Sequence, residues 1–166
     1  MKHRFDTFEE SAKHACATFG IKDDEKINKF AQLYEEDRKH IKPYNDVISE
    51  IRKLRKTYKI GLLSNTENFA IPVLESTGFL DLFDATFFSC DHSRLKPDKK
   101  FFHAILKVLG TRPEETVMIG DSIKNDITPA RQLGMHAILI DRSSKHPEVA
   151  NRITSFDNLK KVIENL

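Results

Sequence analysis

Short uninterrupted apolar runs, each ending abruptly in polar residues, constrain the fold of this chain more than any other feature. Two of them are residues 60–63 (IGLL), followed by Ser64, and residues 117–119 (VMI), followed by Gly120. Runs without polar alternation are typical of strands that are buried on both faces of a parallel sheet. Beyond Pro43 they alternate with stretches that have the apolar spacing of helices. We therefore predict an α/β fold with an open, Rossmann-like parallel sheet.

The elements expected in this part of the chain follow from the same two spacings. In order, they are a helix at 46–57, a strand at 59–64, a helix at 67–77, a strand at 85–89, a helix at 98–109, a strand at 116–119, a helix at 123–133, a strand at 137–140, a short strand near 152–154 and a helix that ends at 166. Residues 141–147 are expected to form a polar surface loop.

In the first 43 residues, the apolar residues have the spacing of helices throughout, and no strand pattern occurs. One amphipathic helix begins near Thr7 and is ended by Gly20, and a second covers residues 24–39 and stops before Pro43. The sequence thus divides into a small helical unit at 1–43 and an α/β core at 44–166.

Length and net charge limit the kinds of molecule that the chain is expected to bind. A chain of 166 residues with a formal charge of +2 suits one domain with a small appendage, and the charge is too small to indicate a nucleic-acid partner. The basic run at 52–56 has apolar residues at helical spacing around it, which favours a solvated helix face over an RNA-binding strip.

Cysteine content and hydropathy indicate the compartment. Cys16 and Cys90 are the only cysteines, and their number and spacing suggest two buried thiols and no disulfide framework or zinc site. No apolar run reaches about 18 residues and no signal-peptide core is present, so we expect no membrane partner and a cytoplasmic location.

Polar side chains follow three of the expected strands. Ser64 and Asn65 end the first strand, Lys96 follows the second, and Asp121 and Asp126 follow the third. In open parallel sheets, ligands bind outside the carboxyl ends of the strands. Each residue by itself can be a helix cap or a surface residue, but their shared position at successive strand ends predicts one site with a hydroxyl, an amide, an ammonium and two acids.

The order of these motifs, SNT at 64–66, LKPD at 95–98 and GDSIKND at 120–126, resembles motifs II, III and IV of the haloacid dehalogenase (HAD) superfamily, in particular its phosphoglycolate-phosphatase-like branch. The resemblance covers nearly the whole chain. Residues 5–11 (FDTFEES) are similar to the start of the family's helical cap, which implies that 1–43 is a short cap and 44–166 the HAD-like core.

The resemblance implies a role for each site residue. Ser64, together with Asn65, would hydrogen-bond a phosphoryl oxygen, and Lys96 would neutralise charge on the nucleophile and the transferring phosphoryl group. Asp121 would bind Mg²⁺. Asp126 would support the metal from its outer shell or orient Lys96. The implied function is hydrolysis of the phosphate monoester of a small phosphorylated metabolite through an aspartyl-phosphate.

The sequence departs from the family at the first motif. Members carry an apolar strand that ends in Asp-x-Asp-x-Thr, whose first Asp is the nucleophile, and no such stretch occurs in this sequence. Asp6 is the only early candidate, but the residues before it are polar and basic and Phe8 stands two positions later. We therefore expect the present N-terminus to lie downstream of the first motif and the chain as printed to be inactive.

Several alternatives stay open. A non-catalytic HAD-like protein that binds a ligand or another protein is the main one, and a mutase is not excluded. A 2-haloacid dehalogenase needs no Mg²⁺, so the acid pair disfavours it. A Rossmann or response-regulator domain is disfavoured because the sequence has no Gly-rich turn or early acidic pocket.

The resemblance also has a consequence for the sheet. It implies that the missing strand would lie between the strands at 59–63 and 116–119, and unpaired backbone groups in a core are costly. We expect these two strands to pair directly, or the gap to be filled by residues 1–6, by a segment of another copy in a strand-exchanged homo-oligomer, or by a first strand outside this sequence.

Overall fold

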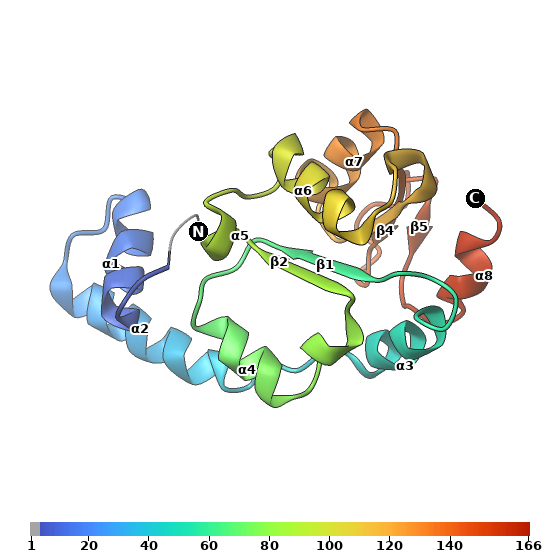
Figure 1. Cartoon of the computed structure of the whole chain (residues 1–166). Coiled ribbons are helices and arrows are strands. Elements are labelled where there is room, and N and C mark those ends of the chain that lie inside the picture. Colours follow the sequence, from blue (N-terminus) through green and yellow to red (C-terminus); the bar gives the residue numbers. More distant parts are fainter. Residues whose placement is uncertain (1–3) are drawn as a thin grey trace.

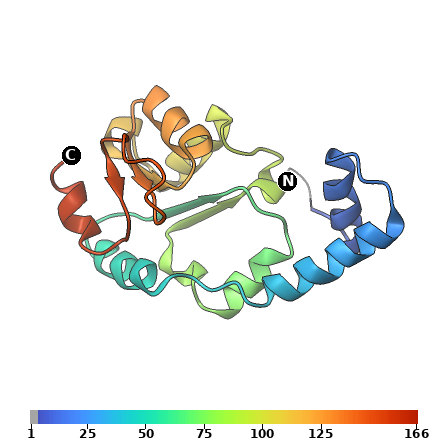
Figure 2. The same cartoon turned by 180° about the vertical axis from the view of Figure 1, so that it is seen from behind.

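The computed structural model describes residues 4–166 and begins with two helices. Helix α1, Phe8–Thr18, is capped by Thr7, whose hydroxyl accepts a hydrogen bond from the Glu10 amide, and α2 covers Asp24–Arg38. Figures 1 and 2 show the pair at one end of the molecule, beside the rest of the chain. Both helices agree with the sequence prediction.

The remaining elements alternate as expected. They are α3 (Asn45–Leu54), β1 (Gly61–Ser64), α4 (Ala70–Ser76), a 3₁₀ turn (Leu80–Leu82), β2 (Ala85–Phe88), α5 (Ser89–His92), α6 (Lys99–Leu109), a 3₁₀ turn (Pro113–Glu115), β3 (Val117–Gly120), a π-helical turn (Ile123–Ile127), α7 (Thr128–Gln132), β4 (His136–Ile140), β5 (Arg152–Ile153) and α8 (Leu159–Ile163). The short α5 and the two 3₁₀ turns were not predicted, because pieces this short have no periodicity to detect.

All strand pairs of the described chain are parallel, which confirms the α/β fold class, but the strands form two sheets. One sheet is β1-β2 and the other is β3-β4-β5. The expected single open sheet is therefore divided, and β1 and β3 do not pair with each other within residues 4–166. The expectation of direct pairing was wrong.

A large apolar cavity separates the two sheets. Its volume is about 1050 Å³, and every residue of β1 and of β3 contributes to its lining. All four residues of β3 are partly exposed, whereas Ala137, Ile138 and Leu139 of the flanked strand β4 are buried. Alternate side chains of β3 still pack into different cores, with Met118 beside α6 and Val117 and Ile119 beside α3 and α8, so both faces of the strand are covered and the partial exposure lies at its edge.

Helices hold the two sheets in position on either side of the cavity. On one face, α6 packs its buried residues Phe101, Phe102, Ile105 and Leu106 into a core that includes side chains of both sheets. On the other face, Leu54 of α3 packs with buried residues of β4 and α8. A further link joins α3 to the second half, since Asp46 accepts hydrogen bonds from the Arg142 side chain and from the Phe156 amide.

The first described residues lie against the loop after β1 and not in the cavity. The Phe5 amide donates to Asn68 Oδ1 at 3.0 Å, the Asn68 side chain donates back to the Phe5 carbonyl at 3.1 Å, and Arg4 pairs with Asp91. The expectation that residues 1–6 fill the gap is therefore wrong for residues 4–6, and residues 1–3 lie outside the described part.

Two smaller predictions are confirmed. Cys16 and Cys90 are free, buried thiols, and the charged residues of the run at 52–56 are exposed. Among the helices of residues 4–166, none combines the length and the hydropathy that crossing a bilayer requires.

Candidate active site

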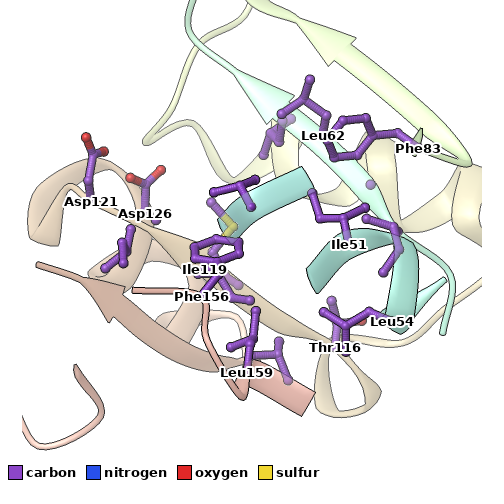
Figure 3. Close-up of a pocket in the computed structure, with 18 of the residues that line it drawn as sticks. Ile51, Leu54, Leu62, Phe83, Thr116, Ile119, Asp121, Asp126, Phe156 and Leu159 are labelled. Carbon is purple, nitrogen blue, oxygen red and sulfur yellow. The ribbon is translucent and has the colours of Figure 1, made fainter. Parts of the chain in front are cut away.

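The carboxyl ends of β1 and β3 meet at a small polar pocket. Its volume is about 230 Å³, and it lies at the end of the apolar cavity where Figure 3 shows the carboxylates of Asp121 and Asp126. All five residues predicted from the sequence line this pocket, together with two that were not predicted: Ser64, Asn65, Lys96, Asp121, Asp126, Ser122 and Asn125. The structure thus brings the predicted residues together.

Lys96 and Asp126 form an ion pair beside the pocket. The distance from Lys96 Nζ to Asp126 Oδ1 is 2.7 Å, and the side chains are 13% and 2% exposed. The other carboxylate oxygen, Oδ2, accepts a hydrogen bond from the Ser122 amide at 3.0 Å. Since both oxygens of Asp126 have partners within the protein, this residue orients Lys96 and the turn after β3.

Asn65 holds the backbone of Lys96. Asn65 Oδ1 accepts from the Lys96 amide at 2.7 Å, and Asn65 Nδ2 donates to the Lys96 carbonyl at 3.0 Å. The Lys96–Pro97 peptide bond is cis. These two hydrogen bonds fix the Lys96 loop to the end of β1. Asn65 therefore positions Lys96, and its Nδ2 already donates a hydrogen bond within the protein.

Gly120 allows the Asp126 side chain to fold over the end of β3. A Cβ atom at position 120 would lie 2.4 Å from Asp126 Cγ and 2.5 Å from Oδ2, far inside van der Waals contact. Glycine is therefore required at this strand end because the Asp126 carboxylate lies so close to its Cα atom. This contact gives a steric explanation for the sequence pattern Gly-Asp-x₄-Asp.

Ser122 and Asn125 line the pocket although the sequence reading did not select them. Ser122 Oγ accepts from the Asn125 amide at 3.1 Å and caps the π-helical turn. This cap was detectable, because Ser followed by a helical stretch is a typical N-cap. The same turn leaves Asn125 at the pocket wall.

Ser89 is another residue that the sequence reading missed. It is fully buried after β2, donates to the Thr66 carbonyl at 3.0 Å and accepts from the Thr66 amide at 3.1 Å. It thereby anchors the loop that carries Ser64 and Asn65. No local signal distinguishes a serine in this role from a surface serine.

The pocket has oxygen donors of the kind that Mg²⁺ prefers. Asp121 is exposed, and the Ser64 hydroxyl and the Asn125 amide lie on the same walls. Within residues 4–166, no group of three or more His, Cys, Asp or Glu side chains is placed to hold a metal ion. Mg²⁺ is commonly held by one or two carboxylates, waters and substrate phosphate, so these residues fit a weak site centred on Asp121.

The first two helices carry aromatic and basic side chains that pack against one another. Tyr34 stacks with Phe8 and Phe30 at ring separations of 5.5 and 6.0 Å, and the Arg38 guanidinium lies 5.5 Å over the Phe8 ring. Burial, reinforced by Glu67, raises the pKa of Tyr34. His40, which follows α2, is exposed and lies near Glu36. The ring contacts make the α1–α2 pair a packed aromatic unit.

Comparison with known proteins identifies the family of the chain. The profile of the haloacid dehalogenase-like hydrolases matches residues 4–140. The chain is 29% identical over 136 residues to a glyceraldehyde 3-phosphate phosphatase of Methanocaldococcus jannaschii, covering 76% of this chain and 58% of that protein. It is 33% identical over 107 residues to the enzyme of the same name from Methanopyrus kandleri, covering 62% and 45%. The chain thus spans about half the length of these curated relatives.

Solved structures give the same fold. A HAD phosphatase from Thermococcus onnurineus superposes with a TM-score of 0.71 at 26% identity, covering 94% of this chain and 87% of that one. A 2-haloacid dehalogenase from Pseudomonas syringae has a TM-score of 0.69 at 22% identity, covering 95% and 70%, which shows likeness of fold alone. The profile match over most of the sequence shows that the chain belongs to the haloacid dehalogenase-like hydrolase family.

Proposed function

We propose that the pocket at the ends of β1 and β3 binds the phosphoryl group of a small phosphorylated metabolite, as part of a Mg²⁺-dependent phosphohydrolase. The observation that carries this proposal is the convergence of Ser64, Lys96 and Asp121 on one polar pocket of about 230 Å³. A hydroxyl donor, an ammonium and an exposed carboxylate are the groups that phosphoryl binding requires. The phosphatase names of the relatives support the same class.

Each residue has a distinct task in this proposal. The Ser64 hydroxyl donates a hydrogen bond to a phosphoryl oxygen, and Lys96, oriented by Asp126 and Asn65, neutralises phosphoryl charge. Asp121 and the adjacent oxygen donors would hold Mg²⁺, which supplies charge stabilisation at the phosphate when bound. Residues 1–43 act as a short cap beside the core.

The second candidate is a non-catalytic HAD-like protein that binds a ligand or another protein. A specific observation favours keeping it: the 166 residues contain no Asp-x-Asp-x-Thr. Phosphate binding without turnover by this chain is compatible with both candidates, so binding is the property to test first.

The test is titration of the chain with inorganic phosphate in the presence of Mg²⁺, followed by ³¹P NMR. We expect Ser64→Ala to weaken phosphate binding by roughly tenfold or more, because a hydrogen bond to a charged group is lost. Ser76→Ala, at an exposed position in α4, is the matched control and should bind as the wild type does. Equal binding by Ser64→Ala and wild type would contradict the proposal.

A further inference from the structure

The loop from the end of β1 to the start of α4, residues 64–69, is held from two sides. Its first residue lines the polar pocket. Asn65 bonds to the backbone of Lys96, and Thr66 exchanges two hydrogen bonds with the Ser89 hydroxyl. The last three residues of the loop contact the N-terminal part of the chain instead. One short loop therefore connects the pocket to the α1–α2 pair.

Glu67 makes the buried contact among these three residues, since it is only 4% exposed. Its Oε1 accepts a hydrogen bond from the Tyr34 hydroxyl at 3.4 Å, and its Oε2 accepts from the Phe69 amide at 2.5 Å. One carboxylate oxygen thus closes the turn before α4, and the other is bonded to α2. A single side chain joins the shape of the loop to the position of the helix.

Asn68 and Phe69 are held by the same part of the chain. The Asn68 side chain forms a reciprocal pair with the backbone of Phe5. Arg38 Nη1 donates to the Phe69 carbonyl at 3.1 Å, and the Phe8 ring meets the Phe69 ring edge-on at a centroid separation of 5.5 Å. Every residue of the second half of the loop is therefore in contact with the N-terminal segment or its helices.

The α1–α2 pair presents these contacts from a packed surface. Tyr34 and Arg38 are four residues apart in α2, so they lie on the same face of the helix. The Phe8 ring of α1 stacks on Tyr34, and the Arg38 guanidinium lies over the same ring. Figures 1 and 2 show α2 reaching the start of α4. The groups that hold the loop are thus supported by their neighbours and are not free surface side chains.

We infer that Glu67 is a positioning residue for phosphoryl binding: it ties the α1–α2 pair to the loop that carries Ser64, so the packing of the helices sets where the Ser64 hydroxyl lies. Through Asn65, the same tie sets the position of Lys96. Glu67 is not one of the residues that line the pocket, and it acts through its neighbours. The inference rests on the proposed function, because it concerns the same pocket.

The coupling follows from the tightness of the loop. Asn65 and Thr66 are the only residues between Ser64 and Glu67, and both are hydrogen-bonded on the core side. The loop has little slack, so a displacement at Glu67 is passed on to Ser64. A misplacement of about 1 Å in a positioned group can cost on the order of a hundredfold. A contact that served only to hold the helices would leave the pocket unchanged when it was removed, and this difference is measurable.

The experiment uses the full chain and two measurements. The first is the affinity for inorganic phosphate in the presence of Mg²⁺, followed by ³¹P NMR. The second is hydrogen exchange of the Thr66 and Lys96 amides, whose acceptors are Ser89 Oγ and Asn65 Oδ1. Because the substitution removes both bonds of the carboxylate, Glu67→Ala should weaken phosphate affinity by about tenfold and speed exchange of both amides by about tenfold.

Two further variants separate positioning from loss of stability. Glu67→Gln can still accept from the Phe69 amide and can donate to the Tyr34 oxygen, so it should stay within about twofold of wild type. Tyr34→Phe keeps the ring packing and removes only the link to α2, and we expect a loss of about threefold. Its effect should nearly vanish when Glu67→Ala is already present. The matched controls are Glu75→Ala in α4 and Tyr44→Phe before α3, both exposed, which should behave as wild type.

Two results would overturn the inference. One is a lower melting temperature in Glu67→Ala with phosphate affinity and the exchange of the Thr66 and Lys96 amides at wild-type values, which would leave Glu67 a structural contact only. The other is wild-type behaviour of Tyr34→Phe in both measurements, which would show that the link to α2 does not reach the pocket. Hydrogen exchange needs no ligand. If the wild-type chain binds no phosphate, the proposed function fails and the exchange rates alone decide the role of Glu67.

Discussion

Lys96, in the loop after α5, and Asp126, in the π-helical turn after β3, follow different sheets, and their charged groups lie 2.7 Å apart. Lys96 follows the β1-β2 sheet and Asp126 follows β3, so the pair connects the two halves at the carboxyl edge. Asp126 is 2% exposed. Its burial makes the pair important for both stability and the shape of the pocket.

We expect removal of one partner to destabilise the chain strongly. Lys96→Met should lower the free energy of unfolding by about 3–5 kcal/mol, because it leaves a buried carboxylate without its counter-ion. Urea denaturation checks this value. Lys99→Met, at an exposed position three residues later, is the control. The double variant Lys96→Met with Asp126→Leu should lose less than the sum of the single losses, and additivity would contradict the coupling.

Magnesium should bind weakly to the chain and depend on Asp121. We expect Asp121→Asn to weaken binding further, because a carboxylate is the preferred Mg²⁺ ligand. Lys96→Ala should bind Mg²⁺ equally or slightly more tightly, since a nearby positive charge is removed. Isothermal titration calorimetry measures both, and an unchanged affinity in Asp121→Asn would remove this residue from the metal site.

Two strand glycines give a comparison of steric tolerance. Gly120→Ala should destabilise the chain by about 1–3 kcal/mol or more, because the new methyl group overlaps the fixed Asp126 carboxylate. Gly61→Ala places its methyl group 2.9 Å from the terminal carbons of Ile105 and Leu109, which border the cavity and can move. Thermal denaturation should therefore show the smaller loss for Gly61→Ala, and the reverse order would contradict the argument.

Asp46 should make stability sensitive to acid. Burial opposes ionisation of this carboxyl, but the Phe156 amide and Arg142 outweigh it and hold the pKa of Asp46 below its usual range. Because the pKa of Asp46 is lower in the folded state than in the unfolded state, ionisation of this carboxyl stabilises the fold. That stabilisation is fully present above the unfolded-state pKa of about 3.9 and is lost as the pH falls through the folded-state pKa. Asp46→Asn should cost about 1.5–3 kcal/mol at pH 7, and the difference from wild type should shrink below about pH 4.

The measurement is urea denaturation of both proteins from pH 7 to pH 3. The control is Asp37→Asn, at an exposed position in α2, which should change stability little at any pH. A pH-independent difference between wild type and Asp46→Asn would show that the lost interaction is not one of charge.

The chain as printed should have no Mg²⁺-dependent phosphatase activity above background. The reason is chemical, because no Asp-x-Asp-x-Thr is present and exposed Asp6 does not line the polar pocket. Hydrolysis of p-nitrophenyl phosphate is the assay. Robust activity that disappears in Asp6→Asn would make Asp6 the nucleophile and contradict this prediction.

The sequence alone determined the order of elements and the membership of the site. Local patterns carry both kinds of information: apolar periodicity separates helices from strands, and the polar residues after 63, 95 and 119 mark the carboxyl edge. For that reason α1, α2 and α6 were predicted to within a residue or two. Ser64, Lys96 and Asp121 were assigned to one site before any distance was known.

Only the tertiary structure decided how the strands associate and what each polar group does. The apolar run of β3 is the same whether its edge is paired or open, because strand pairing depends on which segments are brought alongside and not on local composition. Likewise, Asn65 holds the Lys96 backbone and Gly120 makes room for Asp126, which are contacts between loops that sequence spacing does not encode. The cavity between β1 and β3 arises from α3, α6 and α8 together, and long-range packing of this kind is fixed only when the chain folds.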